Sequence, residues 1–224
     1  MSLVRKTICL IALSACAIAL SSCGGSANNE NGVVLTNLGY FLLPEGTVGC
    51  EDDLPTPVLG LTLPIGEVSS ETLGTDGAII LAVGYQSNLT GQTVRIEATE
   101  LSYFIPGASI QPPSTIVASP LLLGPLDAGE GASVFPTDSS LPPGFSSVCN
   151  RGFGEIQVIP PAVRAFISLN RGSFPEPPFE MFVSARGSGI TSGGNRIYTP
   201  EVTMGITITP ETVIPPTIDV VNEG

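Results

Sequence analysis

Carboxylates are the side chains of this 224-residue chain that could do chemistry, because the sequence contains no histidine. Two pairs have a spacing that could serve an acid–base reaction: Glu97 with Glu100, and Asp127 with Glu130. Two carboxyl groups are what the cleavage of a glycosidic bond requires. Such pairs occur in any acidic protein, and without tryptophan the chain has few aromatic platforms for a sugar. We therefore expect no catalytic residue and no enzyme, with a carboxylate glycosidase as the least favoured alternative.

The acidic triplet Glu51, Asp52 and Asp53 is the candidate metal site. Its oxygens suit calcium, but the spacing does not match an EF-hand loop. Three adjacent acids rarely point to one centre, so a solvated loop is the preferred interpretation.

The absence of histidine also excludes whole classes of site. Ser-His-Asp and Cys-His catalysis, zinc sites built on imidazole and histidine-bound haem all need that side chain. Residues 187–195 are expected to form a Gly/Ser hairpin loop. Its run Gly187-Ser188-Gly189 lies between two expected strands and precedes no helix, so it indicates a turn and not a phosphate-binding loop. We expect no cofactor.

The N-terminal stretch has the features of an export signal. Arg5 and Lys6 precede an apolar run, residues 7–20, which ends in Leu20-Ser21-Ser22-Cys23. The run is short of the roughly 20 residues that a membrane-spanning helix needs. This segment resembles a bacterial lipoprotein signal with its lipobox. The resemblance implies cleavage of residues 1–22 and lipidation of Cys23; a plain secretory signal and an uncleaved anchor are the alternatives.

The resemblance also implies a cellular location. Gly24 follows the cysteine, where an Asp would favour the inner membrane in the enterobacterial pattern, so we expect the outer membrane, on its periplasmic or surface side. Residues 23–32 are small and polar and are predicted to be a flexible tether.

The mature chain would be acidic and free of lysine. Its 202 residues hold six arginines and twenty acids, a net charge of −14. Nucleic-acid binding depends on basic contacts, so we expect no nucleic acid as partner. A lysine-based nucleophile is excluded as well.

Cys50 and Cys149 are the two cysteines left after the signal and Cys23 are set aside. An even pair in an exported protein predicts a disulfide. Two free thiols are the alternative, although no histidine or lysine is present to lower the pKa of either one.

Apolar β-rich runs, broken repeatedly by proline and glycine, predict an all-β domain over residues 33–209, followed by a Pro-rich acidic tail, 210–224. We expect an immunoglobulin-like β-sandwich, although tryptophan is absent and both cysteines fall in loops. A β-barrel and a jelly roll remain open. The expected main strands are residues 33–43, 58–63, 78–85, 93–105, 155–159, 179–187 and 196–209. The last two show apolar alternation, with Met181, Val183 and Ala185 on one face and with Val202, Met204, Ile206 and Ile208.

Four local predictions accompany this fold. Residues 58–63, between prolines, suit a sheet edge. In residues 93–105 one face is expected to hold Val94, Ile96 and Ala98, and the opposite phase Leu101, Tyr103 and Ile105. This change of phase indicates a bulge near Thr99 and Glu100. Residues 111–143 are a long Pro/Gly-rich insertion or edge strands. Residues 161–169 permit one short helix after a proline, with a strand as the competing interpretation.

Tyrosines and arginines are the remaining candidates for binding. Tyrosine rings could line a ligand groove, but sheet edges with a buried ring and a wet hydroxyl are preferred. The arginines of the C-terminal half could meet an anionic partner, although isolated surface residues paired with acids are the commoner case. These residues are Tyr40, Tyr85, Tyr103, Tyr198, Arg164, Arg171, Arg186 and Arg196.

Together these observations predict a lipid-anchored envelope lipoprotein that works as a non-enzymatic binding or assembly module. It would meet the membrane through its lipid and an envelope protein through loops or an edge strand. A carbohydrate- or calcium-binding module is the alternative.

Overall fold

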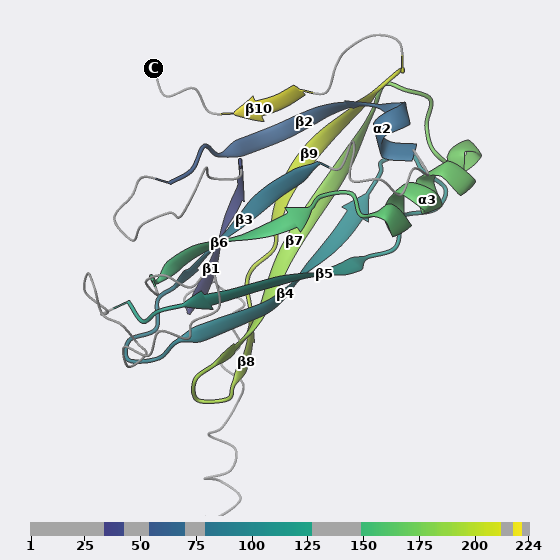
Figure 1. Cartoon of the computed structure of the whole chain (residues 1–224). Coiled ribbons are helices and arrows are strands. Elements are labelled where there is room, and N and C mark those ends of the chain that lie inside the picture. The colour runs from purple at the N-terminus through teal and green to yellow at the C-terminus, as the bar shows by residue number, and fades with distance from the viewer. Residues whose placement is uncertain (1–33, 43–53, 70–78, 127–148, 212–216, 221–224) are drawn as a thin grey trace, which may run out of the picture.

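The computed structural model of the chain describes residues 34–42, 54–69, 79–126, 149–211 and 217–220. Within them two β-sheets bury a common core, so the predicted all-β sandwich is confirmed (Figure 1). The immunoglobulin-like detail stays a prediction. The smaller sheet has the antiparallel order β1-β3-β6, from β1 (Leu35–Phe41), β3 (Ile80–Ser87) and β6 (Arg151–Gln157).

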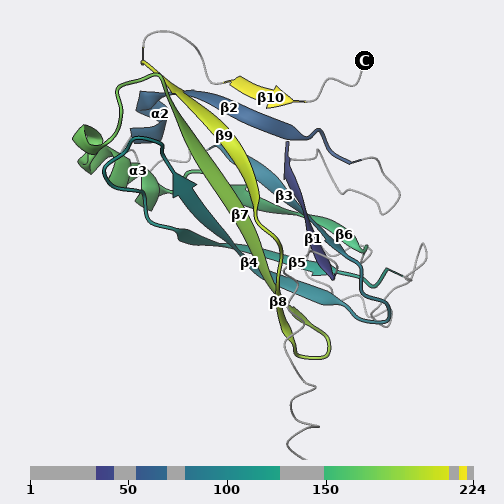
Figure 2. The ribbon, with the colours of Figure 1, turned by 180° about the vertical axis from the view of Figure 1, so that it is seen from behind.

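The large sheet has the strand order β10-β2-β9-β7-β4-β5. Figure 2 shows β10, β2, β9, β7 and β4 following one another across it. Only the β2–β9 pair is parallel among these strands. The members are β2 (Val58–Pro64), β4 (Val94–Phe104), β5 (Thr115–Leu123), β7 (Phe179–Thr191), β9 (Val202–Thr209) and β10 (Thr217–Val220), with β8 (Arg196–Tyr198) pairing with β7.

Strand β7 shows why the sequence forms a sandwich. Along its 13 residues burial alternates, so that Met181 and Val183 are buried in the core while Phe182 and Ser184 face outward. Side chains alternate between the two faces of a strand, and one apolar face therefore suffices to hold the strand on the core.

Two short α-helices lie together at one end of the sandwich, opposite the β7–β8 hairpin (Figure 1). Helix α3 (Pro161–Leu169) confirms the helical interpretation of this segment: Pro161 is at its first turn, and Val163 and Ile167 are buried. Asn170 then ends it, donating its side-chain amide to the carbonyl of Phe166 at 2.8 Å. Helix α2 (Ile65–Ser69) follows β2 directly, where the sequence predicted no helix.

The bulge in β4 is real but lies earlier than predicted. The register of β4 shifts between Ile96 and Ala98 against both neighbouring strands. Val94 and Ile96 are buried, and burial resumes at Thr99, so the prediction that placed Ala98 on the face of Ile96 was wrong. Alanine is small enough to lie on the buried or the outer face of a strand, so Ala98 could not show where the alternation changes phase.

Strand β5 is the edge of the large sheet and runs unbroken through Pro120. A proline lacks the amide hydrogen that a ladder needs, and an edge strand tolerates that loss on its outer side. The first part of residues 111–143 is therefore an edge strand. Residues 127–148 lie outside the described residues.

Strand β2 is not an edge strand, contrary to the prediction. It pairs with β9 on one side and with β10 on the other. Part of the C-terminal tail, Thr217–Val220, thus covers the edge of β2. The residue pattern of β2 could not indicate that a four-residue strand far along the chain, β10, pairs with it.

The C-terminal hairpin also differs in its bounds. The loop predicted over residues 187–195 is much shorter, because β7 extends to Thr191 and the turn closes on Asn195. The predicted strand 196–209 is split into β8 and β9. The Thr199 hydroxyl lies at the split and accepts the amide hydrogen of Gly187 at 2.8 Å.

Candidate binding face

Several predicted site residues fall outside the described residues. They are Cys23, Cys50, Glu51, Asp52, Asp53, Asp127 and Glu130. The Cys50–Cys149 pairing and the calcium site therefore stay predictions. Cys149 is described, and it is buried.

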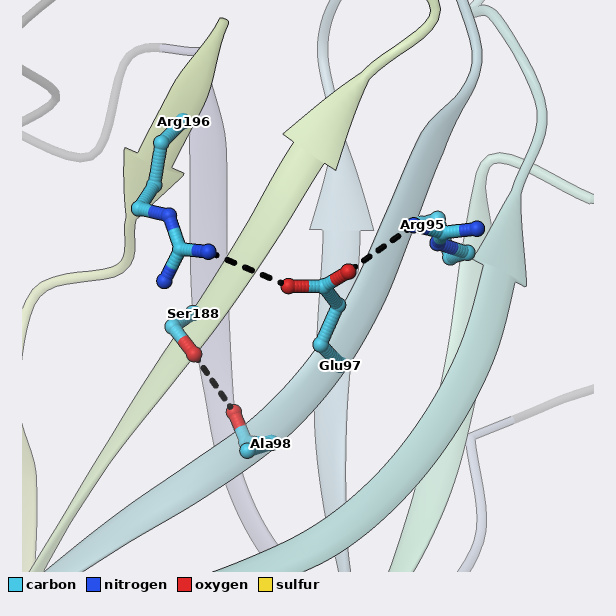
Figure 3. A network of polar contacts seen from close by, with 5 residues as sticks. All are labelled: Arg95, Glu97, Ala98, Ser188 and Arg196. Carbon is cyan, nitrogen blue, oxygen red and sulfur yellow. Dashed lines mark hydrogen bonds and ion pairs between the residues drawn. The ribbon is translucent and has the colours of Figure 1, made fainter. Parts of the chain in front are cut away.

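The carboxylate of Glu97 is held by two arginines and is not paired with Glu100. One oxygen lies 2.9 Å from Nη2 of Arg95, and the other lies 3.5 Å from Nη2 of Arg196 on β8. Figure 3 shows Glu97 between the two guanidinium groups, beside the bond from the Ser188 hydroxyl to the Ala98 carbonyl. This network clamps the bulge of β4 to the hairpin. Its arginine side chains are more than half exposed, so it adds little free energy of unfolding.

Glu100 lies opposite Arg186 in the register of β4 and β7. The Arg186 guanidinium carbon lies 4.7 Å from the ring centroid of Tyr198, a cation–π contact. At this end of the large sheet acids and arginines lie side by side, and the described residues there present no converging pair of carboxyl groups.

Three of the four tyrosines belong to the core, and the expectation of wet hydroxyls was wrong for them. The Tyr40 hydroxyl donates to the carbonyl of Val183 at 2.9 Å, and the Tyr103 hydroxyl donates to that of Val158 at 3.0 Å. The Tyr85 hydroxyl lies 2.6 Å from Oγ1 of Thr99. Only Tyr198 among the four is exposed, at 40%.

Burial raises the pKa of all three core tyrosines, because the phenolate would lose its hydration. For Tyr103 burial raises the pKa to about 12 although the hydrogen bond with Thr115 lowers it. Burial likewise raises the pKa of Tyr85 against a hydrogen bond with Thr99, and that of Tyr40 with help from Tyr103 and Tyr85. The tyrosines therefore hold the two sheets together as neutral donors and do not line a ligand groove.

The arginines divide between surface and core. Arg196 and Arg171 are paired with acids as expected, the latter with Glu176 at 3.7 Å. Arg164 is buried, and its Nε donates to the Ile159 carbonyl at 3.0 Å. Arg164 therefore cannot meet an anionic partner at the surface, because its guanidinium is hydrogen-bonded to the backbone just before α3.

The outer face of the large sheet carries a feature that the sequence analysis missed. In register across five strands lie Phe104, Phe182, Gly205, Gly60 and Asp219. The two phenylalanine rings stack with centroids 6.5 Å apart, and Phe104 is 56% exposed. Phe182 could have been found from the alternation of β7, where it lies between two inward-facing residues. Gly60 and Asp219 could not, because their register depends on long-range pairing.

Hydroxyl groups flank this row on both sides. The Thr207 hydroxyl donates to Oε1 of Glu180 at 2.9 Å, and Ser184 and Thr203 share a hydrogen bond of 2.7 Å. All four side chains come from β7 and β9, and the two pairs precede and follow Phe182 along β7. The face thus combines one exposed and one half-buried aromatic ring with glycine backbone and hydrogen-bonding groups.

Among the described residues no group of three or more metal-ligating side chains comes together. No helix in the described part of the chain has the length and apolar character needed to cross a membrane. Comparisons with protein-family models, with curated proteins and with solved structures gave no match. Function is therefore inferred from the residues of this chain alone.

Proposed function

We propose that the chain is a lipid-anchored envelope lipoprotein that works as a non-enzymatic binding or assembly module. The observation that carries the proposal is the sequence Leu20-Ser21-Ser22-Cys23 after a short apolar run. In this proposal Cys23 bears the lipid, the outer membrane is the location, and the partners are the membrane itself, through the lipid, and an envelope protein.

The fold supports a binding role more than a catalytic one. In the described residues, every buried side-chain nitrogen or oxygen has a hydrogen-bond partner. The core tyrosines and Arg164 are thus engaged in holding the structure. Groups open to a ligand lie on the outer face of the large sheet, where aromatic and acidic side chains are exposed.

Replacement of the lipidated cysteine tests the anchor. Cys23→Ala should release the protein from the membrane fraction and remove the lipid mass from its N-terminus. Cys16→Ala is the matched control, because it removes a cysteine from the same signal and should leave the lipid mass unchanged. Membrane retention of Cys23→Ala would refute the lipid anchor and support an uncleaved signal.

A carbohydrate-binding module is the second candidate, favoured by the stack of the exposed Phe104 on the half-buried Phe182. Aromatic rings beside hydroxyl and carboxylate groups suit the apolar face and polar edge of a sugar. Glycan arrays with and without calcium test it. Absence of glycan binding would contradict this candidate, and binding that is unchanged in Phe182→Leu would show that the stack is not the binding site.

A further inference from the structure

The outer face of the large sheet has an aromatic pair, with Phe104 exposed and Phe182 half-buried, beside a stretch of backbone without side chains of its own. Phe182 lies in register with Gly205 on β9, and Gly205 with Gly60 on β2. Neither glycine has a side chain, so the backbone of two neighbouring strands is bare between the ring of Phe182 and β10. Neighbouring strands lie about 4.8 Å apart, which makes the distance from β7 to β10 about 14 Å. We call Phe104, Phe182, Gly205, Gly60, Asp219 and Glu180 the acidic–aromatic strip.

Two carboxylates lie over the bare backbone. A methyl group built on Gly205 would lie 3.9 Å from Oε2 of Glu180 and 3.9 Å from Cε1 of Phe182. A methyl group built on Gly60 would lie 3.5 Å from Oδ2 of Asp219. A ligand resting on these two glycines would therefore touch an aromatic ring and both carboxylates.

Among the described residues, no basic side chain is paired with the carboxylates of the strip. The three ion pairs among described residues join Glu97 with Arg95 and Arg196, and Glu176 with Arg171. No described basic group lies within ion-pair distance of Glu180 or Asp219. Arg186 lies on the same face, four residues further along β7, and stacks on Tyr198. This end of the sheet is therefore acidic and aromatic, while the other end is close to neutral.

We infer that the acidic–aromatic strip binds an extended, arginine- or lysine-bearing segment of a partner polypeptide. A guanidinium or ammonium group is attracted both to the face of an aromatic ring and to a carboxylate. The net charge of −14 that we expect for the mature chain adds a long-range attraction for a basic partner. The inference rests on the proposed role as a binding module and names the chemistry of its partner.

The shape of the strip favours an extended segment over a single small cation. Its row crosses five strands, and the flanking hydroxyls of Ser184 and Thr207 point to the same face. A peptide laid along the row can place one basic side chain between Phe182 and Glu180 and a second one near Asp219. The hydroxyl groups beside the row can then form hydrogen bonds with the backbone of the bound peptide.

Calorimetric titration of the mature full chain in detergent tests the inference. The probe is a blocked pentapeptide with two arginines separated by a threonine, and its control has citrulline in place of each arginine. We expect the arginine peptide to bind at least about tenfold more tightly, with affinity falling as salt is added. Equal binding of the two peptides would overturn the inference.

Paired variants separate the strip from the general acidity of the protein. Glu180→Gln with Asp219→Asn should weaken binding of the arginine peptide about tenfold. The matched control is Glu100→Gln with Glu155→Gln, which removes two exposed carboxylates elsewhere and should change affinity less than about twofold. Equal losses in the two double variants would show that only the overall charge attracts the peptide and would overturn the assignment to the strip.

Replacement of the ring gives a further readout. Phe182→Leu keeps an apolar side chain but loses the cation–π contact, so affinity for the arginine peptide should fall severalfold. Glycan binding that depends on Phe182, without binding of the arginine peptide, would overturn the inference in favour of the carbohydrate candidate. A Cys23→Ala variant that leaves the membrane while the peptide fails to bind would refute the strip alone and leave the proposed lipoprotein standing.

Discussion

The hydroxyl of Tyr85 lies 2.6 Å from Oγ1 of Thr99, inside the core, and links the smaller sheet to the large sheet just after the β4 bulge. Oγ1 of Thr99 lies in turn 2.7 Å from Oγ of Ser119 on β5. All three side chains are buried, with Tyr85 and Thr99 fully excluded from solvent. A chain of three hydroxyls therefore crosses the interior from β3 to the edge strand.

Tyr85→Phe should lower the free energy of unfolding by about 1–2 kcal/mol, because it removes one hydrogen bond from this buried chain. Denaturant unfolding measures the change. Ser184→Ala is the control, since it breaks a hydroxyl pair of similar length, 2.7 Å, on the exposed face, where water replaces the lost partner. Equal costs for the two variants would contradict the role assigned to the buried chain.

Gly187→Ala should destabilise the protein by about 1–3 kcal/mol through overpacking. Its methyl group would lie 2.5 Å from Cε1 of Tyr85 and 3.2 Å from Cγ2 of Thr199. Both neighbours are buried, so neither can move away freely. Thermal unfolding gives the measurement, and Gly172→Ala is the matched control because nothing lies within 4 Å of its methyl position. An unchanged melting temperature for Gly187→Ala would mean that the Tyr85 ring does not rest on this glycine.

Alkaline pH should unfold the protein through its buried tyrosines. Burial holds the pKa of Tyr40, Tyr85 and Tyr103 above the ordinary value of 10.0, so the folded state keeps the proton longer than the unfolded chain does. Their contribution to stability is thus complete below pH 10 and is lost above it, by about 1.4 kcal/mol per pH unit for each neutral tyrosine.

Denaturant unfolding at a series of pH values between about 8 and 12 checks this dependence. Tyr103→Phe should make the fall above pH 10 shallower, because one titrating group is removed. Ionisation of all the tyrosines near pH 10 in a protein that keeps its near-ultraviolet circular dichroism would contradict the burial of these hydroxyls.

Reduction should lower the melting temperature if Cys50 and Cys149 form the predicted disulfide. The bridge would close a loop of about 100 residues, for which chain entropy gives roughly 4.7 kcal/mol. Intact-mass measurement after alkylation of the native protein counts free thiols directly. Cys50→Ser with Cys149→Ser is the control, because its melting temperature should not respond to reductant. Two free thiols in the native protein would disprove the bridge.

Periodicity in the sequence predicted the strands of the sandwich correctly where one face of the strand is apolar. In β7 and β9 the alternation of Met181, Val183, Met204 and Ile206 predicted both strands and their buried faces. Helix α3 could also be predicted from the sequence, because a proline at its first turn precedes apolar residues at helical spacing. Such local patterns depend only on which face of an element meets the core.

Strand pairing between segments far apart in the sequence could not be predicted. The prediction of β2 as an edge failed because β10 approaches it from the end of the chain, and Gly60 gives no pattern of its own. The acidic–aromatic strip escaped for the same reason: its members come from β4, β7, β9, β2 and β10, and only the pairing register aligns them. Candidate carboxylates chosen by sequence spacing, such as Glu97 with Glu100, were instead held by arginines or lay opposite one.

The parallel pairing of β2 with β9 determines when this protein can fold. Gly60 and Gly205 are neighbours in the finished sheet, although nearly the whole domain separates them along the chain. Until β9 has been synthesised, β2 has no partner on that side, and long-range pairing of this kind is slow because a large loop must close first. The centre of the large sheet is therefore among the last parts to assemble. A chain exported as proposed could still pass through a membrane as an open polypeptide, and acquire its structure only on the far side.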